Sequence, residues 1–290
     1  MTLANLVPLL VPCTLFMVMF ALGAGLPADT DQVWRRHWPL ILRVELATCV
    51  LVPLIGWLLL FTPPARSLSV EVRHAIALMA VCPSAPLILR KAGRQGGDAA
   101  LASWLQGCAA LLAIVSVPLL ARLGERVFGV DGWDVLPRQV AMQVGMIQLV
   151  PLLLGLALRR CFPAAIARLL GPLDRIANTL LLLLLLAVLI RSAPLLWQFG
   201  AANLTGLLVM AVLVLVSLAL GYLLAGEGQE RRITASLVTS MRNPGLALLL
   251  ATRYAPQLPA VKAGILLYVL VTVLVSIPLL RSRRTLAAQR

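Results

Sequence analysis

The chain has 290 residues, of which 61% are hydrophobic and 12% are charged, and its mean hydropathy is +0.96. Soluble globular proteins are roughly half apolar and about a quarter charged, so this composition excludes a water-soluble enzyme. The formal charge of +14 does not indicate nucleic-acid binding, because the Lys and Arg residues are scattered between apolar blocks and form no basic face.

Apolar blocks about 20 residues long follow one another along the chain, which is the length that a helix needs to cross a bilayer. The continuous Leu-rich runs are typical of helices, whereas a β-barrel would show alternating segments of about ten residues. The nine predicted spans are 5–26, 39–62, 74–90, 98–121, 138–158, 176–196, 203–225, 234–252 and 260–280. We therefore expect an all-α polytopic membrane protein, with residues 1–290 forming one membrane domain.

The basic residues predict the orientation of the spans. With the N-terminus outside, sixteen Lys and Arg residues fall on the inner side and eight on the outer side. Because positive charge accumulates on the cytoplasmic side, the chain is predicted to be N-out and C-in in the cytoplasmic (inner) membrane. Segment 160–175 mixes apolar and charged residues and predicts a short amphipathic helix on the cytoplasmic face, connecting two halves.

Two of the predicted spans are interrupted near the middle of the bilayer. The third contains Pro83 and Pro86 on either side of Ser84, and the eighth is interrupted at 242–245 by Pro-Gly after Arg-Asn. Proline removes a backbone donor and clashes with the preceding turn, and glycine adds backbone freedom. Each helix should therefore be kinked or unwound at this point, although packed proline kinks without a role are a common alternative.

The two interruptions occupy equivalent places and predict a repeat. Each lies in the third span of a four-span unit, with a first repeat at about 5–121, a linking span at 138–158 and a second repeat at about 176–280. The two units start on opposite sides of the membrane. Paired broken helices in inverted repeats are typical of secondary transporters, which bind their cargo between the repeats.

Several collinear segments carry a resemblance to one transporter family. They are Met19-Phe20-Ala21-Leu22-Gly23, Val52-Pro53 with Trp57, Cys82-Pro83, and Met241-Arg242-Asn243-Pro244-Gly245-Leu246-Ala247. Through them the chain resembles the bile acid:sodium symporter family over almost its whole length. The resemblance implies a fold with core and panel domains, in which the two broken helices cross, substrate lies near the crossing and alternating access moves it.

The same resemblance shows where this chain departs from its family. The positions that match the family's sodium ligands are here Val238, Arg242, Thr48, Ile88, Leu89, Ala102 and Gln106. Most of these side chains have no suitable oxygen, and a hard cation needs several oxygen ligands. Sodium is therefore not expected as the coupling ion, and neither a metal site nor a cofactor is predicted.

Arg242 is the leading candidate for contact with substrate, because a guanidinium within a span is costly unless it faces a cavity or a partner. Its planar donors suit carboxylate, sulfonate or phosphate groups. The alternative is that it pairs permanently with Glu45 or with an unwound carbonyl. The candidate substrate-binding residues are Arg242, Asn243, Pro244, Gly245, Ser84, Pro83, Pro86, Thr48, Gln106 and Thr239.

Glu45 is the candidate for carrying a coupling proton, because it is a carboxyl within a span, three residues before Thr48. The alternative is a solvated carboxylate at the cytoplasmic end of the span, beside Arg43. The expected function is secondary transport of a small organic anion across the bilayer, either coupled to protons or facilitated.

Two other functions stay open at this point: a sodium-coupled symporter of bile-acid-like anions, and a membrane receptor that does not transport. An enzyme is not expected, because the chain has two histidines and lacks the DDxxD, HExxH and GxSxG motifs.

Overall fold

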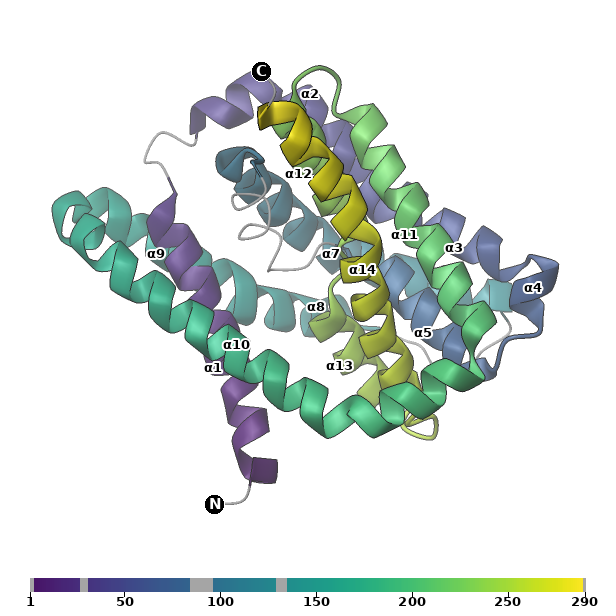
Figure 1. The fold of residues 1–290 in the computed structure, drawn as a ribbon. Coiled ribbons are helices and arrows are strands. Elements are labelled where there is room, and N and C mark those ends of the chain that lie inside the picture. The colour runs from purple at the N-terminus through teal and green to yellow at the C-terminus, as the bar shows by residue number, and fades with distance from the viewer. Residues whose placement is uncertain (1–2, 27–30, 84–95, 129–134, 289–290) are drawn as a thin grey trace.

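The structure is a computed structural model that describes residues 3–26, 31–83, 96–128 and 135–288. These residues form helices joined by short connections, and none of them lies in a strand (Figure 1). The helices are α1 (Leu3–Gly25), α2 (Asp31–Leu46), η1 (Ala47–Leu51), α3 (Val52–Leu60), α4 (Pro63–Arg66), α5 (Val70–Val81), α7 (Ala99–Phe128), α8 (Pro137–Val144), η2 (Gly145–Leu149), α9 (Val150–Cys161), α10 (Pro163–Ala202), α11 (Leu204–Leu224), α12 (Gln229–Ser240), α13 (Pro244–Tyr254) and α14 (Val261–Ala288). The all-helical prediction is confirmed for this part of the chain, as expected where lipid forces each segment to satisfy its own backbone.

Among the described residues, five helical segments are long and apolar enough to cross a membrane. They are Gln32–Leu60, Ala99–Val127, Pro137–Cys161, Leu204–Leu224 and Val261–Pro278. The chain is therefore a multi-pass membrane protein. Leu10–Gly25 is a shorter apolar helix, and the full count of nine spans stays a prediction.

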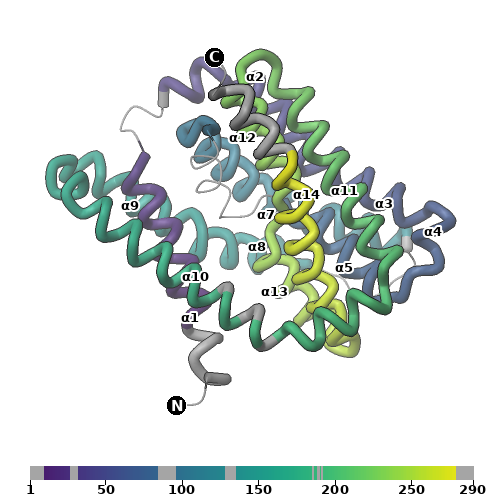
Figure 2. The backbone as a smooth tube through the Cα atoms, in the orientation of Figure 1, coloured from purple at the N-terminus to yellow at the C-terminus, as the bar shows by residue number. Residues whose placement is uncertain are grey.

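The helices pack in two groups (Figure 2). In the first, α1 packs against α9 and α10. In the second, α11 packs against α12 and α14, and α5 packs against α3, α13 and α14. The largest apolar core lies in this second group, and its fully buried members include Leu78, Met79, Leu213 and Tyr268. The contacts of α10 with α14 join the two groups, as does a buried cluster that includes Met19 of α1, Leu152 of α9 and Leu237 of α12.

Two helices widen into a π-helical turn directly before a proline. η1 leads to Val52-Pro53 and η2 leads to Val150-Pro151. The N–H of Val52 donates to the carbonyl of Ala47, five residues back, and that of Val150 donates in the same way to Gly145. Proline has no N–H and crowds the preceding turn, so the helix locally changes its bonding period. π-turns of this kind are frequent at functional sites.

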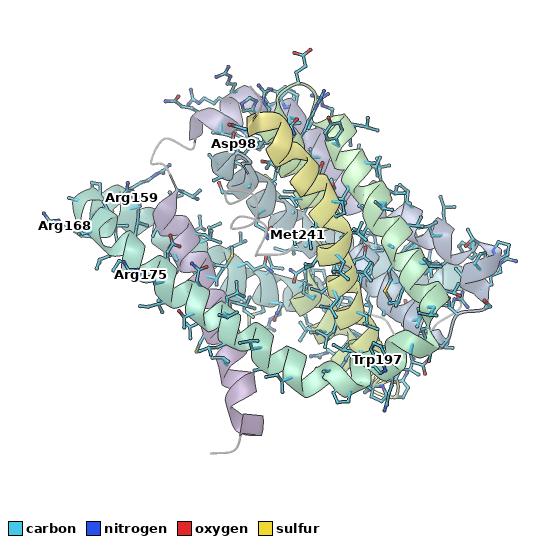
Figure 3. The ribbon with its side chains drawn as sticks, in the orientation of Figure 1. Asp98, Arg159, Arg168, Arg175, Trp197 and Met241 are labelled. Carbon is cyan, nitrogen blue, oxygen red and sulfur yellow. The ribbon has the colours of Figure 1, made fainter. Side chains whose placement is uncertain are left out.

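The predicted connector at 160–175 is wrong as a separate helix. The structure continues it into the next predicted span as one 40-residue helix, α10. Arg168 and Arg175 lie toward one end of α10, and Trp197 lies toward the other (Figure 3). Pro172 lies inside the helix without ending it, so neither the charges nor this proline marked a boundary.

α1 and α9 approach each other closely through glycines. A Cβ built on Gly155 would clash with the carbonyl oxygen of Phe20, and one built on Gly23 would clash with the carbonyl oxygen of Leu152. Small residues let helix backbones approach in a membrane, where packing replaces the hydrophobic drive of water. The glycine that ends the 19–23 motif is therefore explained by this helix contact.

We expect Gly155→Ala to lower the free energy of unfolding by about 1–3 kcal/mol, because the added methyl would force the α1 and α9 backbones apart. The matched control is Gly171→Ala, since a Cβ on Gly171 in α10 would meet no atom within 4 Å. Thermal unfolding of both variants in detergent checks this prediction. Equal stability of the two variants would contradict the close packing of α1 on α9.

Candidate functional site

The first break follows the C-terminus of α5. The last helical hydrogen bond there runs from the N–H of Cys82 to the carbonyl of Leu78, and Cys82 itself is extended, with ψ 101°. The next residue, Pro83, has no N–H, so the carbonyl of Met79 loses the donor that a continuing helix would supply. The break therefore leaves a buried acceptor that needs another partner.

The second break separates α12 from α13. Met241 leaves the helix with ψ 108°, and Asn243 caps α13 by accepting a hydrogen bond from the N–H of Leu246 at 3.1 Å. Pro244 is the first residue of α13, where its missing N–H costs no helical bond. Met241 lies in the middle of the molecule (Figure 3). The predicted interruption of this span is confirmed.

The two breaks touch each other. The backbone N–H of Asn243 donates to the backbone carbonyl of Cys82 at 3.2 Å. This single bond joins backbone atoms 161 residues apart in the chain, each in an extended linker after a helix end. The structure therefore brings the two predicted interruptions together.

The guanidinium of Arg242 lies at this contact and binds three main-chain carbonyls. Nε donates to Met79 at 3.0 Å, Nη1 donates to Thr48 at 3.0 Å, and Nη2 donates to Ala80. Only 2% of Arg242 is exposed. Met79 and Ala80 lie in the last turn of α5, and the negative end of a helix dipole favours a cation. The side chain therefore supplies the donor that Pro83 denies to the carbonyl of Met79, and adds a positive charge.

The third acceptor is also explained by a proline. In η1, the N–H of Val52 bonds to Ala47, and Pro53 has no N–H to offer. The carbonyl of Thr48 is left without a helical donor, and Arg242 supplies one. Pro53 and Pro83 thus each leave one carbonyl without a helical donor, on two different helices, and one guanidinium donates to both carbonyls.

This geometry matches the alternative to direct substrate contact, in which Arg242 pairs with unwound carbonyls. The guanidinium is bound to unwound carbonyls, and none of its described hydrogen bonds goes to Glu45. The Thr48 hydroxyl donates to its own helix at the carbonyl of Val44, at 2.7 Å. Thr48 therefore contacts Arg242 through its carbonyl oxygen and not through its hydroxyl.

Glu45 is buried on α2, with 2% of it exposed, so the alternative of a solvated carboxylate is wrong. Its Oε2 accepts a weak hydrogen bond from the thiol of Cys49, at 3.8 Å. Its Oε1 has no hydrogen-bond partner among the described residues. A buried charge without partners is costly, and a buried carboxyl avoids this cost by holding a proton.

Two further candidates have partners away from the crossing. Thr239 is fully buried, and its hydroxyl bonds to the carbonyl of Ser217 on α11 at 2.7 Å and to carbonyls of its own helix. Gln106 on α7 donates to Gln148 in η2 at 3.0 Å, and both side chains are buried. Thr239 therefore packs α12 on α11, and Gln106 links α7 to η2.

The N-terminus of α13 is the accessible side of the crossing. Asn243 is buried, whereas Pro244 and Gly245 are half-buried. A Cβ built on Gly245 would lie 3.9 Å from the amide nitrogen of Gln143 on α8. The first turn of a helix carries partial positive charge and unpaired N–H groups. This turn and Gln143 together suit an anion better than a cation.

One predicted site residue lies beside the crossing, and four predicted positions lie outside the described residues. Pro83 is buried next to the crossing, whereas Ser84, Pro86, Ile88 and Leu89 lie outside the described residues. The sequence interpretation also missed the carbonyls of Met79 and Ala80. The spacing of four residues between Met79 and Pro83 was the signal, because it identifies the acceptor that a proline leaves without a donor.

Comparisons with known proteins place this geometry in a family context. A family model described as the Sodium Bile acid symporter family matches residues 12–199, which is more than half of the chain. The matched range includes α5 and the first break, and ends before the second. No curated protein matches the chain.

Proposed function

Because the chain belongs to the sodium bile acid symporter family, a family of membrane transporters, we propose that it carries a small organic anion across the cytoplasmic membrane by alternating access, without sodium. The family match confirms the resemblance that the sequence motifs carried. The coarse class, a membrane transporter of the bile acid or organic anion type, follows from the family. The absence of sodium coupling and the alternating-access cycle are the proposal.

One observation carries the proposal: Arg242 places a fixed positive charge on three main-chain carbonyls where the two broken helices meet. A charge buried at this depth favours an anion nearby, because opposite charges attract more strongly in a medium of low polarity. The half-buried first turn of α13, at Pro244 and Gly245, is the place where an anion can approach it. An organic acid bound there would interact with the N–H of Gly245 and with the amide of Gln143.

The same contacts argue against a bound sodium ion. A hard cation takes oxygen ligands, and the carbonyls of Thr48, Met79 and Ala80 already accept from the guanidinium. Val238 and Ala102 are fully buried and carry no side-chain oxygen. The internal guanidinium thus takes the electrostatic part that a bound cation would have.

The larger arrangement belongs to the same proposal. The α1, α9 and α10 group would be the panel, and the group with both breaks would be the core. The two groups meet where α10 packs on α14 and where Met19, Leu152 and Leu237 pack together, and one group would rock against the other across this boundary. The inverted repeats, nine spans, N-out/C-in orientation and inner-membrane location are further parts of the proposal.

Counterflow in proteoliposomes tests the function directly. Vesicles are loaded with an unlabelled carboxylate or sulfonate, diluted into a trace of the same labelled anion, and assayed in sodium-free buffer. We expect labelled anion to accumulate transiently. Binding without exchange would instead favour a receptor, and exchange that needs sodium would favour a sodium-coupled symporter.

We propose Glu45 as the group that carries a coupling proton. It is buried near Arg242, and one of its oxygens lacks a described partner.

We expect Glu45→Gln to remove the stimulation of uptake by an inward proton gradient, because the amide cannot release or bind the proton. Exchange at equal pH should persist. Uptake driven by pH steps checks this prediction, with the exposed Glu230→Gln as the control. Unchanged stimulation in Glu45→Gln would contradict the role.

A further inference from the structure

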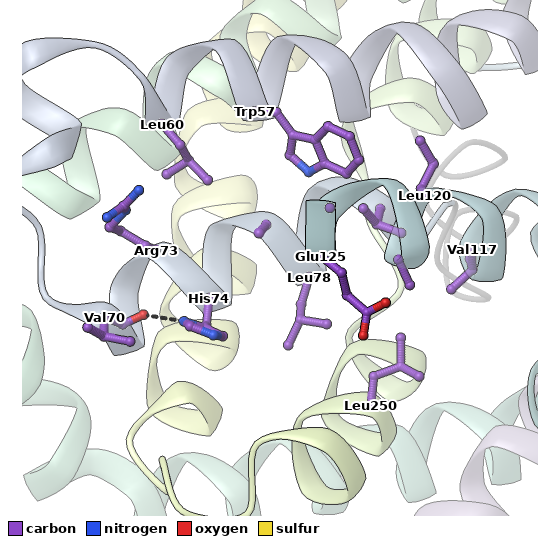
Figure 4. Close-up of a pocket in the computed structure, with 14 residues that line it drawn as sticks. Trp57, Leu60, Val70, Arg73, His74, Leu78, Val117, Leu120, Glu125 and Leu250 are labelled. Atoms are coloured by element: carbon purple, nitrogen blue, oxygen red, sulfur yellow. Dashed lines mark hydrogen bonds between the residues drawn. The ribbon is translucent and has the colours of Figure 1, made fainter. Parts of the chain in front are cut away.

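A cavity of about 260 Å³ lies between α3, α5, α7 and α13 (Figure 4). Its lining residues include neither Arg242 nor the residues to which Arg242 donates. Its walls are mostly apolar and include Trp57 and Leu60 from α3, Leu78 and Val81 from α5, and Leu250 from α13. Val81 comes directly before Cys82, so the inner wall reaches the crossing of the broken helices. The cavity is therefore lined by helices around the crossing, and none of its lining residues belongs to α1, α9 or α10.

Three ionisable side chains line this cavity: Arg73 and His74 from the first turns of α5, and Glu125 from the end of α7. Arg73 is half-buried, and its guanidinium makes no hydrogen bond or ion pair with the described residues. The ring of His74 donates through Nδ1 to the carbonyl of Val70, at 2.7 Å. Arg73 and Glu125 lie on opposite sides of His74 and Leu78 (Figure 4). The positive and negative ends of the cavity are thus separated.

The cavity opens at the face where α3 ends, α5 begins and α7 ends. Val70, at its rim, is 53% exposed. Under the predicted orientation this is the outer face of the membrane. Arg73 lies one turn into α5, a depth from which an arginine can extend its guanidinium toward the interface while its stem covers apolar surface.

We propose that this cavity is a second binding site, for an amphipathic organic anion. The apolar body would lie against Trp57 and Leu78, and the acidic group would meet the Arg73 guanidinium. Concave apolar walls with a few placed polar groups are typical of ligand sites, and a guanidinium binds carboxylate or sulfonate in a paired geometry. Glu125 repels an acidic group at the opposite end, which fixes the direction of the ligand. The proposal does not depend on the transport function.

Two sources could supply such a ligand: a single-chain acid from water, or a membrane lipid with an anionic headgroup. Both have an acidic head and an apolar chain. The experiment therefore first establishes the site with a defined acid and then adds an anionic lipid as a competitor.

The probe is 10-bromodecanoate, because bromine quenches tryptophan fluorescence on contact and Trp57 lines the cavity. The full-length protein is placed in phosphatidylcholine nanodiscs and titrated with the probe. We expect saturable quenching in the wild type that is missing in Trp57→Phe. The uncharged 10-bromodecanol should bind about tenfold more weakly, since a hydrogen bond to a charged group contributes on this scale.

Two variants test the site in independent ways. Arg73→Gln should weaken binding of 10-bromodecanoate about tenfold and leave 10-bromodecanol nearly unchanged, because it removes the charged donor that only the acid needs. Ala77→Leu should abolish binding of both probes, because Ala77 lines the cavity and the larger side chain fills it. The matched control is Arg66→Gln, an exposed arginine on α4 outside the cavity. Its binding should equal that of the wild type.

Quenching that is the same in the wild type, Arg73→Gln and Ala77→Leu would overturn the proposal, because it would reflect probe dissolved in lipid. Once the site is established, the titration is repeated in nanodiscs with phosphatidylglycerol. Weaker apparent binding there assigns the site to an anionic lipid, and unchanged binding assigns it to an acid from water. All readouts are binding measurements, so a failure of counterflow would not affect them.

Discussion

Replacing Arg242 by Ala is expected to abolish uptake of the organic anion and to lower the free energy of unfolding by about 3 kcal/mol or more. Three buried carbonyls, those of Thr48, Met79 and Ala80, would lose their donor, and each orphaned acceptor costs roughly 1–3 kcal/mol. The loss is partly offset if water enters the space. Uptake in sodium-free proteoliposomes and thermal unfolding in detergent measure the two effects.

Because loss of uptake could reflect misfolding alone, chemical rescue is the control for Arg242→Ala. Guanidinium ion at millimolar concentration fits the vacated carbonyls, so we expect it to restore part of the stability and of the uptake. Arg242→Lys should keep the charge but lose the planar set of donors, and fall between the wild type and Ala. Full uptake by Arg242→Ala without any additive would contradict the role of the guanidinium.

Pro83→Ala is expected to lower uptake about tenfold without lowering stability. Alanine restores an N–H that can donate to the carbonyl of Met79, and this donor competes with Nε of Arg242 for the same acceptor. The backbone hydrogen bond offsets the loss of the guanidinium contact, so the protein should unfold at the same or a higher temperature. Activity and stability would then change in opposite directions, which a simple folding defect does not produce.

Pro39→Ala is the matched control for Pro83→Ala. Pro39 is exposed and lies inside α2, which continues past it. Its replacement should leave uptake at the wild-type level. If both proline variants lost uptake equally, or neither did, the break after α5 would have no particular part in transport.

Much of the fold could be predicted because an apolar segment in lipid must satisfy its own backbone hydrogen bonds, which favours a helix. The length of the apolar blocks predicted helices, and the starts of α7 and α11 lie within a residue of the predicted spans at 98 and 203. The Pro-Gly pair at 244–245 predicted the second break for a local reason, the missing N–H and the backbone freedom. These features depend on neighbouring residues alone, which is why sequence sufficed.

The site was harder to predict because its acceptors are backbone atoms brought together by tertiary structure. Periodicity does not show that Pro53 and Pro83, on two helices, leave carbonyls that face one guanidinium. Thr239 was a candidate for substrate binding, yet the helix turns its hydroxyl toward α11. The long α10 was missed because charges and Pro172 suggested a boundary, although such residues are tolerated within a helix that extends beyond the bilayer.

The flux of labelled sodium during anion transport tests the central claim most directly. Proteoliposomes are given the transported anion and ²²Na⁺ outside, and both labels are counted inside over the same time course. An internal guanidinium in place of a bound cation predicts that the anion accumulates while sodium stays at the level of protein-free vesicles. Sodium that enters in fixed proportion to the anion would show that the protein binds and carries sodium despite the guanidinium, and would contradict the account.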